Sequence, residues 1–198
     1  MSWIILGAFA FFAILLIFWA IGIYNRLVVL RNQFTNSFAQ VEVQLKRRYD
    51  LIPNLVEMVK GIMGHEKDFF TEVVEKRNQA VARLQSCADN PGDPQAMQQL
   101  VGAESALGGA LGRLFALSED YPEMKTHKNM LQLQEDLRTT ENKVAFARQA
   151  YNDSVTTYNT YKQTFPPVLF AGTFGHARDA ALLDFDDNEI NEAPKVSF

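Results

Sequence analysis

Residues 3–24 read WIILGAFAFFAILLIFWAIGIY and contain no charged side chain. As a helix rising ~1.5 Å per residue, this stretch would be about 33 Å long, enough to cross a hydrocarbon core of ~30 Å. A cleaved signal peptide fits less well, because only Met1 and Ser2 precede the stretch and neither is basic. We therefore predict a membrane anchor over residues 1–24, with the lipid bilayer as its partner. The anchor residues expected to contact lipid include Trp3, Phe12, Leu16, Trp19 and Tyr24.

The rest of the 198-residue chain is more hydrophilic, yet it keeps enough apolar side chains to form a core. That composition excludes a disordered protein, and a single apolar stretch excludes a transporter or channel with many spans. The lone cysteine, Cys87, excludes a disulfide scaffold and a cysteine-based zinc site.

Basic residues follow the anchor and none precedes it. Arg26 and Arg31 lie just after it, and Lys46-Arg47-Arg48 lies further along. Because positive residues favour the cytoplasmic side of a membrane, we expect a single-pass protein whose short N-terminus is outside and whose body is cytoplasmic.

The seven prolines, at 53, 91, 94, 122, 166, 167 and 194, divide the chain into proline-free stretches. Proline is tolerated in the first turn of a helix and is costly further in. This predicts helices from the membrane to about residue 48, from 50 to 87, from 94 to 118 and from 121 to 165. The expected fold is all-α: a transmembrane helix continuing into a long antiparallel four-helix bundle or coiled-coil-like body. The predicted parts are the anchor (1–24), the helical bundle (25–165) and an irregular C-terminal tail (166–198).

Two features favour close packing of helices or of subunits. The second and fourth predicted helices would reach about 55 and 65 Å, which is more than the other two can cover. The third carries glycines at four-residue spacing, which allow another helix to approach closely. That helix is either wedged among its own neighbours or forms a seam between subunits. The candidate seam residues are Gly102, Gly108, Gly112, Phe34 and Phe38.

The tail divides into an apolar part and an acidic part. If neighbouring helices pack antiparallel, Pro166-Pro167 returns to the membrane. Residues 168–175 would then either touch the membrane interface or cover the end of the bundle. The acidic residues that follow are a candidate docking element for an unknown membrane-protein partner; its residues are Asp184, Asp186, Asp187 and Phe198.

No set of residues in the sequence indicates catalysis, a cofactor or a metal. His65-Glu66 begins a zinc-protease pattern, but Phe69 stands where the second histidine is required. Asp184–Asn188 begins like a calcium loop and then lacks its glycine and final acidic ligand. The net charge of −4 argues against nucleic acid, and we interpret Lys46-Arg47-Arg48 as a solvated helix end. We expect a protein that is not an enzyme.

Several stretches resemble the LemA family of bacterial membrane proteins. They are YNRLV at 24–28, FAQVEVQLKRRYDLIPNLV at 38–56, YPEMK at 121–125, Tyr151-Asn152, Tyr158-Asn159 and APKVSF at 193–198. The resemblance implies a single-span anchor in the bacterial inner membrane and an antiparallel helical body, but no established activity. The motif residues are interpreted as helix ends and packing contacts: Tyr49, Asp50, Pro53, Tyr121, Pro122, Tyr151 and Tyr158.

The leading functional hypothesis is a non-enzymatic, membrane-anchored scaffold that self-assembles into a homo-oligomer and organises membrane or partner proteins. The alternative is an adaptor for a membrane protease or an envelope-stress system, docking through its acidic tail. The weakest hypothesis is an enzyme or a metal-binding bundle.

Overall fold

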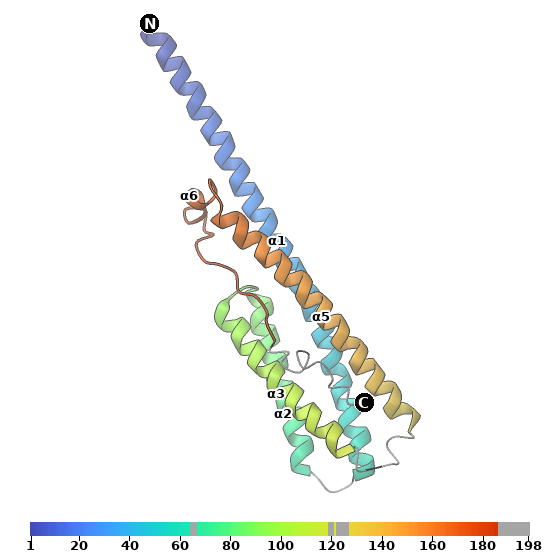
Figure 1. Ribbon diagram of the computed structural model, residues 1–198. Helices are drawn as coiled ribbons and strands as arrows, with labels where there is room; N and C mark the ends of the chain where they lie inside the picture. Colours follow the sequence, from blue (N-terminus) through green and yellow to red (C-terminus); the bar gives the residue numbers. More distant parts are fainter. Residues whose placement is uncertain (64–66, 119–120, 122–126, 186–198) are drawn as a thin grey trace, which may run out of the picture.

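A computed structural model describes residues 1–63, 67–118, 121 and 127–185 (Figure 1). These residues are mostly helical and contain no strand, so the predicted all-α class is confirmed. The predicted four-helix bundle is not confirmed. α1 and α5 lie side by side as a long pair, and α2 and α3 form a hairpin against the distal half of α1. The helices are α1 (Ser2–Met63), α2 (Lys67–Asp89), α3 (Pro94–Ser118), α5 (Lys128–Gln163) and α6 (Val168–Ala171).

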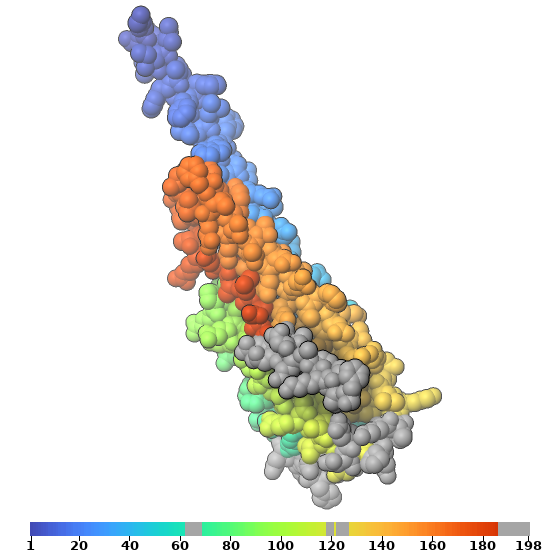
Figure 2. Space-filling view, viewed as in Figure 1, coloured from blue at the N-terminus to red at the C-terminus, as the bar shows by residue number. Residues whose placement is uncertain are grey.

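α1 is the axis of the molecule, 62 residues without a break. Its first turns stand clear of the body, as Figure 2 shows, and the predicted continuity from anchor to body is confirmed. From Ile23 onward, one stripe of α1 is buried by the other elements because apolar residues recur every three or four positions. The buried stripe consists of Ile23, Leu27, Leu30, Phe34, Phe38, Val41, Leu45, Tyr49, Ile52, Leu55, Val56 and Val59.

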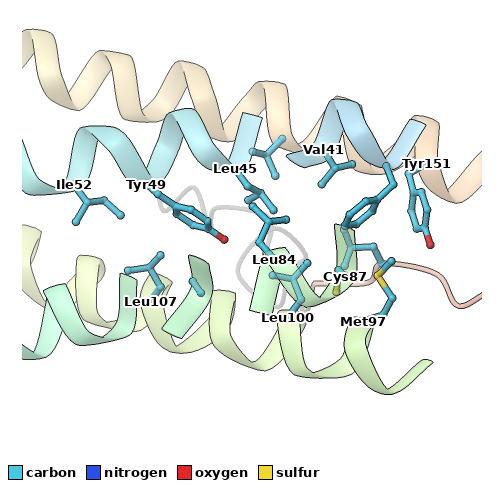
Figure 3. Close-up of a cluster of buried hydrophobic side chains, with 14 of the residues drawn as sticks. Val41, Leu45, Tyr49, Ile52, Leu84, Cys87, Met97, Leu100, Leu107 and Tyr151 are labelled. Carbon is cyan, nitrogen blue, oxygen red and sulfur yellow. The ribbon is translucent and has the colours of Figure 1, made fainter. Parts of the chain in front are cut away.

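The α1–α5 seam is aromatic. The ring of Phe34 lies 5.1 Å from that of Tyr158, and the ring of Phe38 lies 5.5 Å from that of Tyr151. Further along α1 the core widens to include the hairpin, and Figure 3 shows Tyr49 directed toward it. Around Tyr49 the core contains Leu84, Cys87, Met97, Leu100 and Leu107.

The predicted boundary between the first two helices is wrong. Pro53 lies inside α1 instead of in the first turn of the next helix. A proline has no N–H, so the carbonyl of Tyr49, four residues earlier, loses its helical donor. Arg77 of α2 replaces that donor, because its Nε donates to the Tyr49 carbonyl oxygen at 3.2 Å. The Pro53 ring is on the exposed side, and α1 continues to Met63 while α2 is 23 residues long.

Asp50 was expected to stand at the start of a helix. It lies within α1 instead, and its Oδ1 is 3.7 Å from a guanidinium nitrogen of Arg77. The start of α3 is confirmed: Pro94 is its first residue, and Asp93 Oδ1 accepts the N–H of Ala96 at 2.9 Å. The predicted start of the fourth helix at Pro122 lies outside the described residues, and α5 begins at Lys128.

We predict that Arg77→Met lowers the free energy of unfolding by about 1–3 kcal/mol, because it leaves the Tyr49 carbonyl without its donor. Adding Pro53→Ala restores the backbone N–H and should make the same Arg77 substitution nearly neutral. Denaturant unfolding in detergent of the four members of this cycle measures the coupling. Asp50→Asn is the control for the ion pair, and a purely electrostatic role for Arg77 would give the same loss with alanine at 53.

Candidate membrane and assembly surfaces

The anchor predicted from the sequence is bare of protein contacts over most of its length. Trp3 is 87% exposed, and Phe12, Leu16, Trp19 and Tyr24 are exposed as well. Two helices are long and apolar enough to cross a membrane, Ser2–Gly61 and Pro94–Leu117, within the part of the chain that the structure describes. The second packs as α3 against α2 in the body, so the first is the candidate span.

The segment after α5 returns to the anchor. The ring of Phe170 lies 6.4 Å from Trp19, and the ring of Phe174 lies 5.3 Å from Tyr24. Both pairs meet edge to face, and Figure 1 shows α6 beside α1 at the level where α1 leaves the body. The chain reversal expected at Pro166-Pro167 thus brings residues 168–175 against the C-terminal end of the anchor.

Two asparagines of α5 hold the tail. Asn159 donates from Nδ2 to the Ala180 carbonyl at 2.8 Å and accepts the Ala180 N–H at Oδ1 at 3.0 Å. Asn152 makes the same pair of bonds with Leu183, at 3.1 and 2.8 Å. Each amide thereby replaces the two backbone partners that a neighbouring strand would supply. The asparagines are seven residues apart, two helical turns, so both face the same segment.

We call the contacts of Asn152 and Asn159 with the tail the clamp, and neighbouring side chains contribute to it. The Tyr151 hydroxyl donates to the Ala181 carbonyl at 2.8 Å, and Lys162 Nζ donates to the Arg178 carbonyl at 2.5 Å. Lys162 is buried and also pairs with Asp179. The motif tyrosines predicted as packing contacts therefore position the tail as well. Sequence reasoning did not identify the tail as their partner, although the repeated Tyr-Asn pair at a seven-residue interval was a visible signal.

The clamped tail also reaches the α2–α3 turn. The Ala181 N–H donates to the Gly92 carbonyl at 2.9 Å. Gly92 has a φ of +88°, and a Cβ there would meet the Cβ of Ala180 at 3.0 Å and the Phe34 ring at 3.3 Å. Glycine is required at this position because no other side chain fits between α1 and the tail. One short segment therefore connects α5, α1 and the hairpin.

His176 is buried at the start of the clamp, and its Nδ1 lies 2.8 Å from the Tyr158 hydroxyl. Burial, followed by the positive charges of Arg31 and Lys162, lowers the pKa of His176 below 6.5. The imidazole is therefore neutral at neutral pH and accepts or donates within the clamp without charge. His127 is exposed before α5, and His65 lies outside the described residues.

A second buried polar group joins α1 to α3. Glu104 is 6% exposed and accepts the Tyr49 hydroxyl, while Arg48 Nη1 lies 3.4 Å from its other oxygen. Burial raises the pKa of Glu104, and the Arg48 guanidinium opposes that rise. Arg48 also lies 4.0 Å from Glu141 of α5. The interpretation of Arg48 as a solvated helix end is therefore wrong, because it links three helices.

Other candidate chemical groups are dispersed. Burial in the core, with a smaller contribution from Asp93, raises the pKa of the Cys87 thiol to about 11, so it stays protonated at neutral pH. Among residues 1–63, 67–118, 121 and 127–185, no three His, Cys, Asp or Glu side chains lie close enough to hold a metal ion. Tyr121 is half-buried and Asp184 is exposed; Pro122, Asp186, Asp187 and Phe198 lie outside the described residues.

With respect to the described part of the chain, the glycines of α3 face open space. Gly102, Gly109 and Gly112 are exposed, and a Cβ added at any of them would meet nothing within 4 Å. Gly108 is half-buried with the same free space. Phe34 and Phe38, predicted as seam residues together with these glycines, lie in the helix–helix seam between α1 and α5. The outward stripe of α3, here called the glycine face, consists of Gln98, Gly102, Ser105, Gly109, Gly112 and Ala116.

The LemA family model matches residues 37–198, from the middle of α1 through the clamp to the end of the chain. The chain belongs to the LemA family. This confirms the resemblance seen in the sequence. The matched region contains Tyr49, Glu104, Asn152 and Asn159, so the buried links lie within the family portion of the molecule.

Similar proteins in other organisms agree with this assignment. The chain is 27% identical to magnetosome protein MamQ of Magnetospirillum gryphiswaldense, over 78% of this chain and 62% of that protein. It is 28% identical to magnetosome protein MamQ 2 of Paramagnetospirillum magneticum over the same shares. Protein LemA of Metamycoplasma hominis is 26% identical over 80% of this chain and 72% of its own length. The chain thus spans less than two thirds of the MamQ proteins.

We predict that Asn159→Asp increases hydrogen exchange at the Ala180 amide and leaves the tail less protected. Aspartate keeps an acceptor but cannot donate to the Ala180 carbonyl, and the loss of about 1–1.5 kcal/mol corresponds to roughly tenfold faster local opening. Asn152→Asp should act in the same way on Leu183. Asn142→Asp, on an exposed turn of the same helix, is the matched control, and equal exchange in all three variants would contradict the clamp.

We predict that the free energy of unfolding falls as the pH drops below about 6.5. The unfolded chain then takes up a proton at residue 176, whereas the folded chain resists it because its pKa is lowered. Above 6.5 both states are neutral there and the contribution is constant. His176→Gln, which keeps a hydrogen-bonding group, should remove this part of the pH dependence. Urea unfolding of both proteins at pH 7.5 and 5.5 tests it, and identical pH dependence would exclude this role.

Proposed function

We propose that this LemA-family chain is a non-enzymatic, membrane-anchored helical scaffold that self-assembles into a homo-oligomer and organises membrane or partner proteins. The proposal includes a bacterial inner-membrane location, with residues 3–24 spanning the bilayer and the body on the cytoplasmic side. The observation that carries self-assembly is the glycine face of α3.

The anchoring part of the proposal is supported by the exposure of the uncharged first third of α1. A helix whose first turns are uncharged and uncovered by protein needs an apolar environment. Arg26 and Arg31 are exposed just beyond it, where basic residues favour the cytoplasmic side. The relatives named MamQ and LemA come from bacteria. Because the anchor and the body share one helix, the body's orientation to the membrane is fixed by α1.

The assembly half is supported by a stability argument. A glycine inside a helix costs about 1 kcal/mol relative to alanine. The three glycines of the glycine face incur this cost although a Cβ at any of them would meet no atom of another element within 4 Å among the described residues. Small side chains at seven-residue spacing give a flat stripe along which a second helix can pack closely. The stripe also lacks charge, unlike an ordinary solvated helix face. A second copy of the chain is the partner that we propose for it.

The test introduces bulk on the glycine face without disturbing the fold. Gly102→Leu with Gly109→Leu adds side chains into open space, so the hairpin should stay folded and gain helix propensity. We predict that this double variant dissociates the oligomer, as measured by native mass or light scattering of the full chain in mild detergent.

The matched control is Gln79→Leu with Ala82→Leu, which adds the same side chains to exposed positions of α2. This control should assemble like the unmodified chain. A monodisperse monomer of the unmodified protein would refute self-assembly altogether. An oligomer that persists in the glycine variant would show that α3 is not its seam.

A further inference from the structure

The segment between α5 and the clamp exposes large apolar side chains that the fold does not use. Residues 164–175 read TFPPVLFAGTFG and carry no charge. Phe165 is 78% exposed, Leu169 65% and Val168 51%. Grouped apolar side chains of this kind on a surface mark a contact with something outside the chain. The group formed by Phe165, Val168 and Leu169, together with Phe170 and Phe174 behind them, is called here the apolar lip.

The height of the lip along α1 is set by its ring contacts. Phe170 lies against Trp19, and Trp19 precedes the first charged residue of α1, Arg26, by seven positions. At ~1.5 Å per residue, Phe170 is therefore about 10 Å nearer the N-terminus than Arg26. Phe174 lies lower, against Tyr24. The lip thus overlaps the last two turns of the uncharged stretch of α1, and Figure 2 shows it beside the emerging helix.

Most backbone N–H groups of the lip are hydrogen-bonded within the segment and do not need water as a partner. Pro166 and Pro167 have no N–H, and the next four N–H groups, of Val168 to Ala171, donate to carbonyls of Thr164, Pro166 and Pro167 at 2.9–3.1 Å. The N–H groups of Phe174, Gly175 and His176 also donate within the segment, at 2.8–3.2 Å. An irregular loop tolerates an apolar environment only where its polar backbone groups are satisfied internally. An ordinary solvated loop has no need of this pairing.

We infer that the apolar lip inserts into the bilayer beside the anchor, as a second lipid contact that does not span the membrane. This inference rests on the proposed anchoring by residues 3–24 and adds a partner for a segment that the anchor does not include. A lipid surface is the occupant, and not another protein, because the exposed side chains continue the lipid-facing surface of α1 at the same height. Interfacial segments bury their apolar face about 5–10 Å into the bilayer, which agrees with the overlap between the lip and the anchor.

The test measures lipid contact at single positions of the full chain in phosphatidylcholine–phosphatidylglycerol vesicles. In a Cys87→Ala background, an environment-sensitive fluorophore is attached at Leu169→Cys and, separately, at Val168→Cys. Two further labelled sites serve as references. Phe12→Cys reports the anchor, and Leu131→Cys, exposed near the start of α5 and far from the anchor, reports the solvated body.

With brominated lipid acyl chains, we expect strong quenching at 168, 169 and 12, and none at 131. Quenching at 12 without quenching at 168 and 169 overturns the lip while leaving the anchor intact. No quenching at 12 refutes the anchoring itself. Blue-shifted but unquenched emission at 168 and 169 means that protein covers the lip, and this also overturns the inference.

Discussion

The length of α1 is the constraint on which the rest of the structure depends. A straight helix of 62 residues reaches roughly 90 Å and cannot cover its own apolar stripe. Its first third stays largely exposed, and the other described elements of the body are arranged along the remainder. α5 covers the stripe from the anchor onward, the α2–α3 hairpin covers the distal half, and the tail closes the corner between them. Because α1 is one continuous helix, any rotation of its N-terminal part is transmitted directly to the body.

The tail is the second organising element, and it works through side-chain amides. A segment with no helix or strand partner must satisfy its backbone N–H and carbonyl groups elsewhere. Asn152 and Asn159 each supply a donor from the amide nitrogen and an acceptor from the amide oxygen, whereas an ionised carboxylate can only accept. With Gly92 opposite, the same segment also fixes the hairpin against α5. The apolar lip and the clamp are successive parts of one chain reversal, so the position of the lip depends on the clamp below it.

Much of the fold could be predicted from local patterns. The uncharged stretch, the three-and-four spacing from Leu27 to Leu45 and the Asp93-Pro94 cap all describe single helices, and single helices follow local rules. The prediction failed at Pro53, which lies inside α1. The Tyr49 carbonyl, which proline leaves without a backbone donor, accepts a hydrogen bond from Arg77 of α2, and a local pattern does not show such a partner. Arg48 and Glu104 meet for a similarly non-local reason. The tail clamp could have been inferred, since two Tyr-Asn pairs seven residues apart face one side of α5. The open space over the glycine face could not, because a sequence does not show what is absent from a helix surface.

The ring pairs Trp19–Phe170 and Tyr24–Phe174 join the two ends of the described chain. During synthesis the anchor leaves the ribosome well before α6 and the clamped tail. Contacts between segments so distant in sequence form late, because the intervening chain must already be ordered. Until then Trp19 and Tyr24 of α1 lack the rings that pack against them. The molecule can therefore close only after residue 183 has been synthesised, and a chain shortened before residue 165 keeps the whole of α1 but lacks the contacts that α6 and the clamped tail make with the rest of the body.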